Sequence, residues 1–245
     1  MKTDSGTTQT YSQTERGLRE LRSRIVAGHW PAMTKLREVP LAEAFGLSRT
    51  PLRAALQRLE QEGLLEHSGA GYKIRAFSIA DALTAIELRG VIEGTAARMA
   101  AERRTTQADL SQIKSIVLSI DQVIEIDAID GYAKLNDQFH DELARLAGNE
   151  LIKSEVERAS RLPFAAPSAF SSNSEDQERF KTSLIVGQQH HHALVQAIER
   201  GEGARADALA REHAHLAKAN IEVAFRDRNE NNRKVPLLAL VTNGT

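Results

Sequence analysis

The pattern of apolar positions along this chain changes near residue 78. From Ile79 onward Ala, Leu, Glu and Arg dominate, and apolar residues recur with the 3.6-residue period of a helix. Glycines fall mostly where such segments end, as at Gly148 and Gly201. The pattern predicts helices over 79–103, 106–127, 129–147, 149–162, 177–200 and 203–226. Residues 78–226 are therefore expected to form an all-α bundle of six or seven helices.

Other segments interrupt or flank this bundle. Pro163–Pro167 and the serines that follow predict a loop or a bent helix. Residues 1–10 are polar and are expected to be disordered. Residues 227–245 form a tail in which a charged, Asn-rich stretch precedes the apolar run VPLLALV. The pattern leaves open whether that run packs on its own chain or on a second subunit.

Before the bundle, the chain reads LAEAFGLSRTPLRAALQRLEQEGLL, which predicts two helices joined by a sharp turn. Gly46 accepts the backbone conformation that the turn requires, and Ser48 or Thr50 can cap the second helix. One face of that second helix is apolar. Arg49 and Arg53, four residues apart, lie together on its other face.

The next residues, SGAGYKIR, predict a small β-hairpin. On its returning strand Ile74 points one way, while Lys73 and Arg75 point the other. Basic side chains beside a glycine tip can approach a phosphate backbone closely. Each arginine taken alone is equally explained as a solvated surface charge. Together with the turn, cap and hairpin, they predict a winged helix-turn-helix over 11–77 that places its second helix in the major groove of DNA.

The distribution of charge agrees with two domains that have different roles. The whole chain carries 32 Lys and Arg against 33 Asp and Glu, which is uninformative. Residues 11–77 hold 11 basic and 7 acidic side chains, whereas residues 78–225 hold 16 and 23. The first segment is therefore suited to bind polyanions, and the second would be repelled by them.

Composition excludes several classes of protein. The chain has no cysteine, so neither disulfides nor thiolate metal ligands are possible. Its N-terminus lacks the apolar core of a signal peptide, and no apolar run approaches eighteen residues. We expect a cytoplasmic protein that does not associate with membranes.

Polar residues fall on the inner faces of three predicted helices. Helical phase selects His140, His191 and His213 as inward-facing, with Asn136 one turn before the first of them. A lone inward histidine is usually a neutral core residue that is hydrogen-bonded to a neighbour. Three of them on separate helices favour a metal centre, for which zinc, nickel, cobalt or manganese is suitable.

An arginine on the first bundle helix, Arg89, also lies among apolar positions and therefore needs a partner. The partner can be Glu93, one turn away, or the carboxylate of a ligand, which a guanidinium grips through two hydrogen bonds. The sequence leaves both alternatives open.

With these motifs, the chain resembles GntR-family transcription regulators of the FadR-like subgroup, whose effector domain is called FCD. LAEAFGLSRTPLRAALQRLEQEGLL carries the likeness in the first part, and ELRGVIEGTAARMAA, NDQFHDELARLAGNELI and HHALVQAIERGE carry it in the second. The resemblance implies an FCD-like bundle, a homodimer and a small carboxylic acid as effector.

The resemblance also implies roles for particular residues. The family's DNA contacts map onto Ser48, Arg49, Thr50, Arg53 and Gly71, to which the basic wing strand adds Lys73. Many members have a basic residue where Val39 stands, so one phosphate contact is expected to be missing. The ligands of metal-binding FCD domains map onto Asn136, His140, His191 and His213, with Asn136 in place of an aspartate. Arg89 is the candidate for holding the effector.

These observations lead to one main hypothesis of function. We expect a dimeric repressor that binds a palindromic operator and responds to a small carboxylate at a pocket containing a divalent metal, zinc or nickel being favoured. In the alternative, the metal ion itself is the signal. An enzyme is disfavoured because no carboxylate is obviously placed as a general base, although Asp137 and Glu93 are near in sequence. A constitutive architectural DNA binder would not need convergent polar groups inside its bundle.

Overall fold

The computed structural model describes residues 12–69, 71–126, 128–162, 164, 177–231 and 236–242. The chain divides into two compact units, Met1–Ala76 and Phe77–Thr245. The expectation of disorder over residues 1–10 lies outside the described residues. The expected break at Pro163–Pro167 also lies outside them, apart from Phe164.

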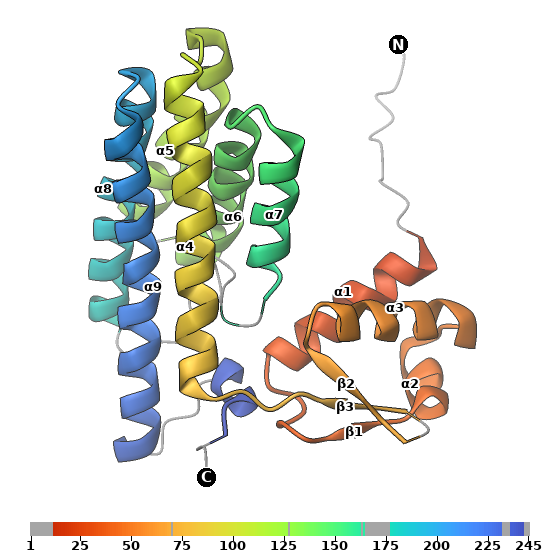
Figure 1. The fold of residues 1–245 in the computed structure, drawn as a ribbon. Helices are drawn as coiled ribbons and strands as arrows, with labels where there is room; N and C mark the ends of the chain where they lie inside the picture. Colours follow the sequence, from red (N-terminus) through yellow and green to blue (C-terminus); the bar gives the residue numbers. More distant parts are fainter. Residues whose placement is uncertain are drawn as a thin grey trace, which may run out of the picture. The chain divides into compact units, whose positions relative to one another are not determined.

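The first unit contains three helices and a small sheet (Figure 1). Its helices are α1 (Gln13–Val26), α2 (Glu38–Phe45) and α3 (Arg49–Gln61). Gly46 ends α2 with a φ of 58°, a left-handed conformation that costs glycine little, and this gives the predicted sharp turn. The predicted apolar face of α3 is fully buried through Leu52, Leu56 and Leu59.

The predicted hairpin consists of β2 (Leu65–Ser68) and β3 (Gly71–Ile74), in antiparallel register with Ser68 opposite Gly71. A third strand that the sequence did not predict, β1 (Lys35–Leu36), pairs with β3 to give the order β1-β3-β2. Two residues are too few to show the alternation by which strands are recognised. The first unit is thus a winged helix-turn-helix with a three-stranded sheet.

The second unit is an all-α bundle, as the sequence predicted. Its α-helices within the described residues are α4 (Ile79–Glu102), α5 (Gln107–Glu125), α6 (Ile129–Leu146), α7 (Glu150–Ser160), α8 (Gln177–Glu199) and α9 (Gly203–Asn231). The last of these continues beyond its expected end at residue 226. No glycine or proline interrupts the chain between there and Pro236, so nothing in the sequence stops the helix earlier.

The bundle is closely packed where α4 meets α9. A Cβ placed on Gly90 would lie 2.8 Å from Cβ of Ala214, and one on Gly94 would lie 2.1 Å from Oδ1 of Asp207. A side chain at Gly90 would therefore push against Ala214, and one at Gly94 would displace the carboxylate of Asp207. This close approach fixes Arg89 and Glu93 of α4 relative to the residues of α9.

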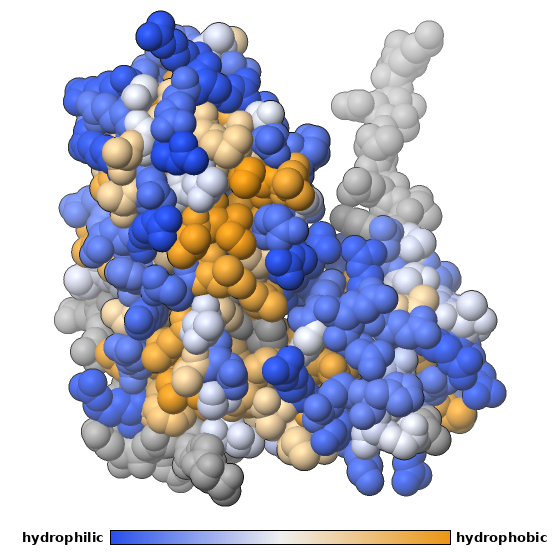
Figure 2. All heavy atoms as spheres, viewed as in Figure 1, coloured by the Kyte–Doolittle hydropathy of each residue, from blue (hydrophilic) through white to orange (hydrophobic). Residues whose placement is uncertain are grey.

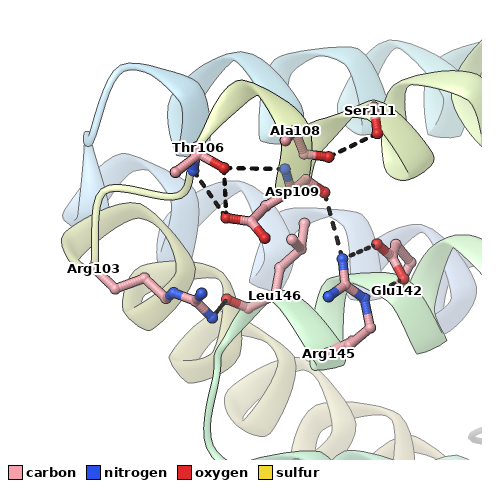
Figure 3. Close-up of polar contacts among 8 residues, drawn as sticks. All are labelled: Arg103, Thr106, Ala108, Asp109, Ser111, Glu142, Arg145 and Leu146. Atoms are coloured by element: carbon pink, nitrogen blue, oxygen red, sulfur yellow. Dashed lines mark hydrogen bonds and ion pairs between the residues drawn. The ribbon is translucent and has the colours of Figure 1, made fainter.

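The α4–α5 loop ties three helix ends together (Figure 3). Nη1 of Arg103 donates to the carbonyl of Leu146 at the end of α6, at 3.1 Å. Thr106 caps α5 through reciprocal hydrogen bonds with Asp109. Nη2 of Arg145 donates to the backbone carbonyl of Asp109 at 3.4 Å. These contacts hold α6, the helix that carries two of the predicted ligands.

Part of the C-terminal tail packs within the second unit. A 3₁₀ helix, η1 (Pro236–Leu240), is followed by Val241, which bridges to Phe77. The amide of Phe77 donates to the carbonyl of Leu240, and the amide of Thr242 donates to the carbonyl of Phe77. Leu238, Leu240 and Val241 are buried, so this apolar run is covered by its own chain.

None of the helices in the described part of the chain combines the length and apolar character that a membrane crossing requires.

Candidate nucleic-acid interface and metal centre

The N-terminal turn of α3 presents the predicted DNA contacts to solvent. Ser48, Arg49, Thr50 and Arg53 are all exposed. Ser48 stands at the N-cap position, but its side chain makes no capping hydrogen bond. Its hydroxyl can therefore serve a partner outside the chain without uncapping the helix.

Arg53 has a partner that sequence reasoning missed. Its Nε donates to Oε1 of Glu38 at 3.1 Å, and its Nη2 donates to Oε2 at 2.9 Å. These hydrogen bonds hold the pKa of Glu38 below its ordinary value, so the carboxylate is charged at neutral pH. The side chain of Arg53 is 54% exposed, which leaves its outer edge accessible. Val39, the next residue of α2, is 51% exposed. It stands where the resemblance led us to expect one phosphate contact fewer than in many family members.

The wing residues lie on β3, the central strand of the sheet. Gly71 opens β3, and Lys73 stands opposite Glu66 of β2. Nζ of Lys73 lies 2.8 Å from Oε1 of Glu66. Arg53 and Lys73 are thus exposed or half-buried, and each is paired with a carboxylate of the same unit.

In the bundle, the three inward-facing histidines come together. His140 of α6, His191 of α8 and His213 of α9 each offer a ring nitrogen, and these atoms lie within 4.8 Å of one another. The three residues are 2%, 0% and 8% exposed. Helical phase was therefore sufficient to select residues from three helices that meet in space.

Each of these imidazoles has a nitrogen without a hydrogen-bond partner among the described residues, namely Nε2 of His140, Nε2 of His191 and Nδ1 of His213. Burial, reinforced by the neighbouring imidazoles, holds the pKa values of His191 and His213 well below the ordinary value. Both are therefore neutral at pH 7, and neutral imidazole is the form that binds metal ions. Three convergent nitrogens of this kind fit a divalent transition metal.

Asn136 lies beside the cluster, one turn before His140, and is 2% exposed. Its Oδ1 accepts a hydrogen bond from the hydroxyl of Tyr132 at 3.2 Å. The amide is thus oriented by a buried tyrosine.

Glu93 lies beside Arg89, as the sequence suggested, and also beside His140, which the sequence did not suggest. Its Oε2 lies 3.8 Å from Nε of Arg89, which is too long for a hydrogen bond. Its Oε1 lies 3.0 Å from Nδ1 of His140, although the two groups are not aligned as a hydrogen bond. Burial raises the pKa of Glu93, but its interactions with His140 and Arg89 outweigh burial and hold the pKa below its ordinary value. The carboxylate therefore links the arginine to the histidine cluster.

Arg89 is only 1% exposed, and its Nε and Nη1 find no hydrogen-bond acceptor in the part of the chain that the structure describes. Buried guanidinium donors without acceptors are costly. The Arg89–Glu93 pair predicted as one alternative therefore exists only as a loose contact, and donors remain for an anionic ligand.

The chain matches two models of protein families. The FCD domain matches residues 84–216, which is more than half of the chain, and the model described as "Bacterial regulatory proteins, gntR family" matches residues 13–74. The chain belongs to the GntR family of bacterial regulatory proteins. This GntR-family chain is a transcription regulator in which a DNA-binding helix-turn-helix precedes an FCD effector domain.

Individual relatives agree with this assignment. The chain is 34% identical over 142 residues to the Nta operon transcriptional regulator of Aminobacter aminovorans, covering 57% of this chain and 67% of that protein. It is 29% identical over 126 residues to a probable D-xylose utilization operon transcriptional repressor of Paenarthrobacter nicotinovorans, covering 51% and 55%. Among solved structures, E. coli McbR/YncC aligns with a TM-score of 0.65 at 19% identity, covering 90% of this chain and all of that one. The last likeness shows the fold.

Proposed function

We propose that this regulator is a homodimeric repressor whose binding to a palindromic operator is changed by a small carboxylate held at a metal-containing pocket. The observation that carries the proposal is the pair of unpartnered donors on buried Arg89, on the helix that also carries Glu93 beside the histidine cluster. A ligand carboxylate is a suitable acceptor for either donor, because guanidinium groups form charge-assisted hydrogen bonds with carboxylates.

The three buried histidines are the proposed metal ligands. His140, His191 and His213 would bind a divalent ion, with zinc or nickel favoured by the all-nitrogen set, and Asn136 is a candidate fourth ligand. When bound, the ion supplies a positive charge that attracts and orients a carboxylate. Arg89 orients the anion from α4, and the surrounding buried residues keep water away from it.

The DNA-binding half of the proposal rests on α3 and the wing. Ser48, Arg49, Thr50 and Arg53 would enter the major groove, while Gly71 and Lys73 would approach the backbone. Two copies related by a two-fold axis would read two half-sites in opposite orientation. Figure 2 shows apolar side chains gathered over α4 on one face of the bundle, and α4 and α7 include the exposed residues Leu88 and Leu151. Such a surface supports pairing through the bundle.

The connection between the two units suggests how ligand binding in the bundle would affect the DNA-binding unit. The helix α4 carries Arg89 and Glu93, and it begins at Ile79, directly after the end of the first unit. A ligand that binds more tightly to one position of α4 shifts the population toward that position. The name of the P. nicotinovorans relative includes the word repressor, which supports repression as the direction of control.

The alternative function is that of a metal sensor, in which the ion alone is the signal. The contact between Glu93 and His140 favours it, because a metal on His140 would act directly on a residue of α4. In that case operator affinity follows metal concentration with no organic acid present.

The melting temperature separates these functions. Chelated and Zn²⁺- or Ni²⁺-loaded protein is heated with lactate, malonate, succinate or citrate, using the wild type and Arg89→Lys. We expect one acid to raise the melting temperature only when metal is present, and to raise it less in the variant. A shift from metal alone supports the sensor. No shift from any combination would refute both functions of the site.

A further inference from the structure

One buried amide connects the histidine cluster to a helix that supplies none of its proposed ligands. Gln188 lies on α8, three residues before His191, and is 5% exposed. Its Nε2 donates to the backbone carbonyl of Val117 at 2.9 Å and to Oδ1 of Asp121 at 2.6 Å, both on α5. Its Oε1 lies 3.0 Å from Nδ1 of His191.

The chemistry of these partners fixes which way the amide faces. A backbone carbonyl and a carboxylate can only accept hydrogen bonds, so the NH₂ end of Gln188 must face Val117 and Asp121. The oxygen of Gln188 therefore faces His191, and an amide oxygen can only accept. It follows that Nδ1 of His191 carries the ring proton.

We propose that Gln188 is a positioning residue that selects the tautomer of His191. With the proton on Nδ1, the lone pair is on Nε2, the nitrogen that has no hydrogen-bond partner among the described residues. This inference rests on the proposed metal site for its use, because a metal requires that lone pair. An outer partner of this kind orients the ring before any ion arrives.

Asp121 holds Gln188 and is itself held at the surface. Its Oδ1 and Oδ2 lie 3.0 and 3.1 Å from Nε2 of His192, and the side chains of Asp121 and His192 are 39% and 52% exposed. A continuous chain of contacts thus runs from exposed His192 through Asp121 and Gln188 to buried His191. Through this chain α5 is coupled to the histidine cluster without contributing a ligand to it.

The tautomer is measured directly in metal-free protein. Two-bond ¹H–¹⁵N NMR correlations of full-length protein labelled at histidine nitrogens distinguish a proton on Nδ1 from one on Nε2. We expect His191 of the wild type to be protonated on Nδ1. In Gln188→Leu this preference is lost, and Zn²⁺ affinity, measured by competition with a chromophoric chelator, falls about ten- to a hundredfold.

Two further variants make the test specific. Gln189→Leu makes the same change at the neighbouring exposed position and is expected to alter neither reading. Asp121→Leu removes one of the two acceptors of Gln188 at a half-exposed site. We expect it to weaken the preference of His191 for a proton on Nδ1. This second variant keeps the test valid if Gln188→Leu does not fold. A wild-type His191 protonated on Nε2, or a tautomer unchanged in both folded variants, overturns the inference. Wild-type protein that has the expected tautomer but binds no Zn²⁺ would instead refute the proposed metal site.

Discussion

Each unit contains an arginine–glutamate pair at its proposed site, and the two pairs differ in burial and in hydrogen bonding. Arg53 and Glu38 form three hydrogen bonds at the N-terminal end of α3. Arg89 and Glu93 are buried in the bundle, 3.8 Å apart, with donors of the arginine left unpartnered. Arg53 is 54% exposed, so water can compensate its charge when the side chain leaves Glu38 for DNA. The buried pair is out of reach of bulk solvent, and a ligand carboxylate is the acceptor that we propose for its unused donors.

The two pairs must therefore be tested by different measurements. Changes at the exposed pair should alter binding to DNA and leave the unfolding free energy unchanged. Changes at the buried pair should alter stability first.

The largest expected effect is on the buried pair. Glu93→Gln leaves Arg89 as an uncompensated buried charge, and we expect the free energy of unfolding to fall by about 3 kcal/mol. Urea denaturation followed by circular dichroism measures this change. The matched variant Glu38→Gln should leave the midpoint of unfolding where it is. Equal effects of the two changes would contradict the distinction between the pairs.

The next largest effect is on the dependence of stability on pH. In the metal-free bundle the folded-state pKa values of His191 and His213 lie below the unfolded value of about 6.5. The unfolded chain therefore binds more protons than the folded chain as the pH falls. The contribution of the two neutral histidines to stability is complete above a pH of about 6.5 and is lost below it. We expect a loss of up to about 1.4 kcal/mol per pH unit for each imidazole. Urea midpoints at pH 7.5 and 5.5 measure it, and His191→Gln should depend less steeply on pH.

At the exposed surface, Arg49→Ala and Arg53→Ala are expected to weaken operator binding about tenfold or more while the unfolding midpoint stays constant. The operator is first selected from a randomised duplex library, which should yield an inverted repeat, and affinity is then followed by fluorescence anisotropy at fixed salt. Arg58→Ala, in the last turn of α3, is the control. An operator affinity that is the same in all three variants would refute the proposed interface.

The smallest effect distinguishes two serines at N-cap positions. Ser78 caps α4 with reciprocal hydrogen bonds to Asp81, so Ser78→Ala should cost about 1 kcal/mol of stability. Ser48 makes no such bond, so Ser48→Ala should affect stability less and should weaken DNA binding. Thermal unfolding and anisotropy together measure both. A larger loss of stability in Ser48→Ala than in Ser78→Ala would contradict this assignment.

The sequence predicted the helix-turn-helix with its hairpin, the bundle helices and the histidines that meet inside the bundle, but neither α1 nor β1. Helical phase identified His140, His191 and His213 because a residue's face depends only on its position along the helix. The same phase indicates Gln188, three residues before His191, yet an amide among histidines was not recognised as a functional residue.

Other features depend on distances between helices, which no periodicity contains. Glu93 could be paired with Arg89 from sequence, but its contact with His140 requires the placement of α6 against α4. The pairing of Glu38 with Arg53 likewise depends on how α2 packs on α3. The strand β1 was missed because it is short, and its pairing with β3 is non-local.

Binding of a metal ion by the buried histidines is measured directly by titration. Zn²⁺ is added to chelator-treated wild type, His213→Gln and His215→Gln, the last of these being a half-exposed histidine on the same helix. We expect one ion per chain in the wild type and in His215→Gln, with binding lost or weakened by more than about a hundredfold in His213→Gln. Equal binding by all three proteins would show that the ion binds elsewhere and would contradict the account.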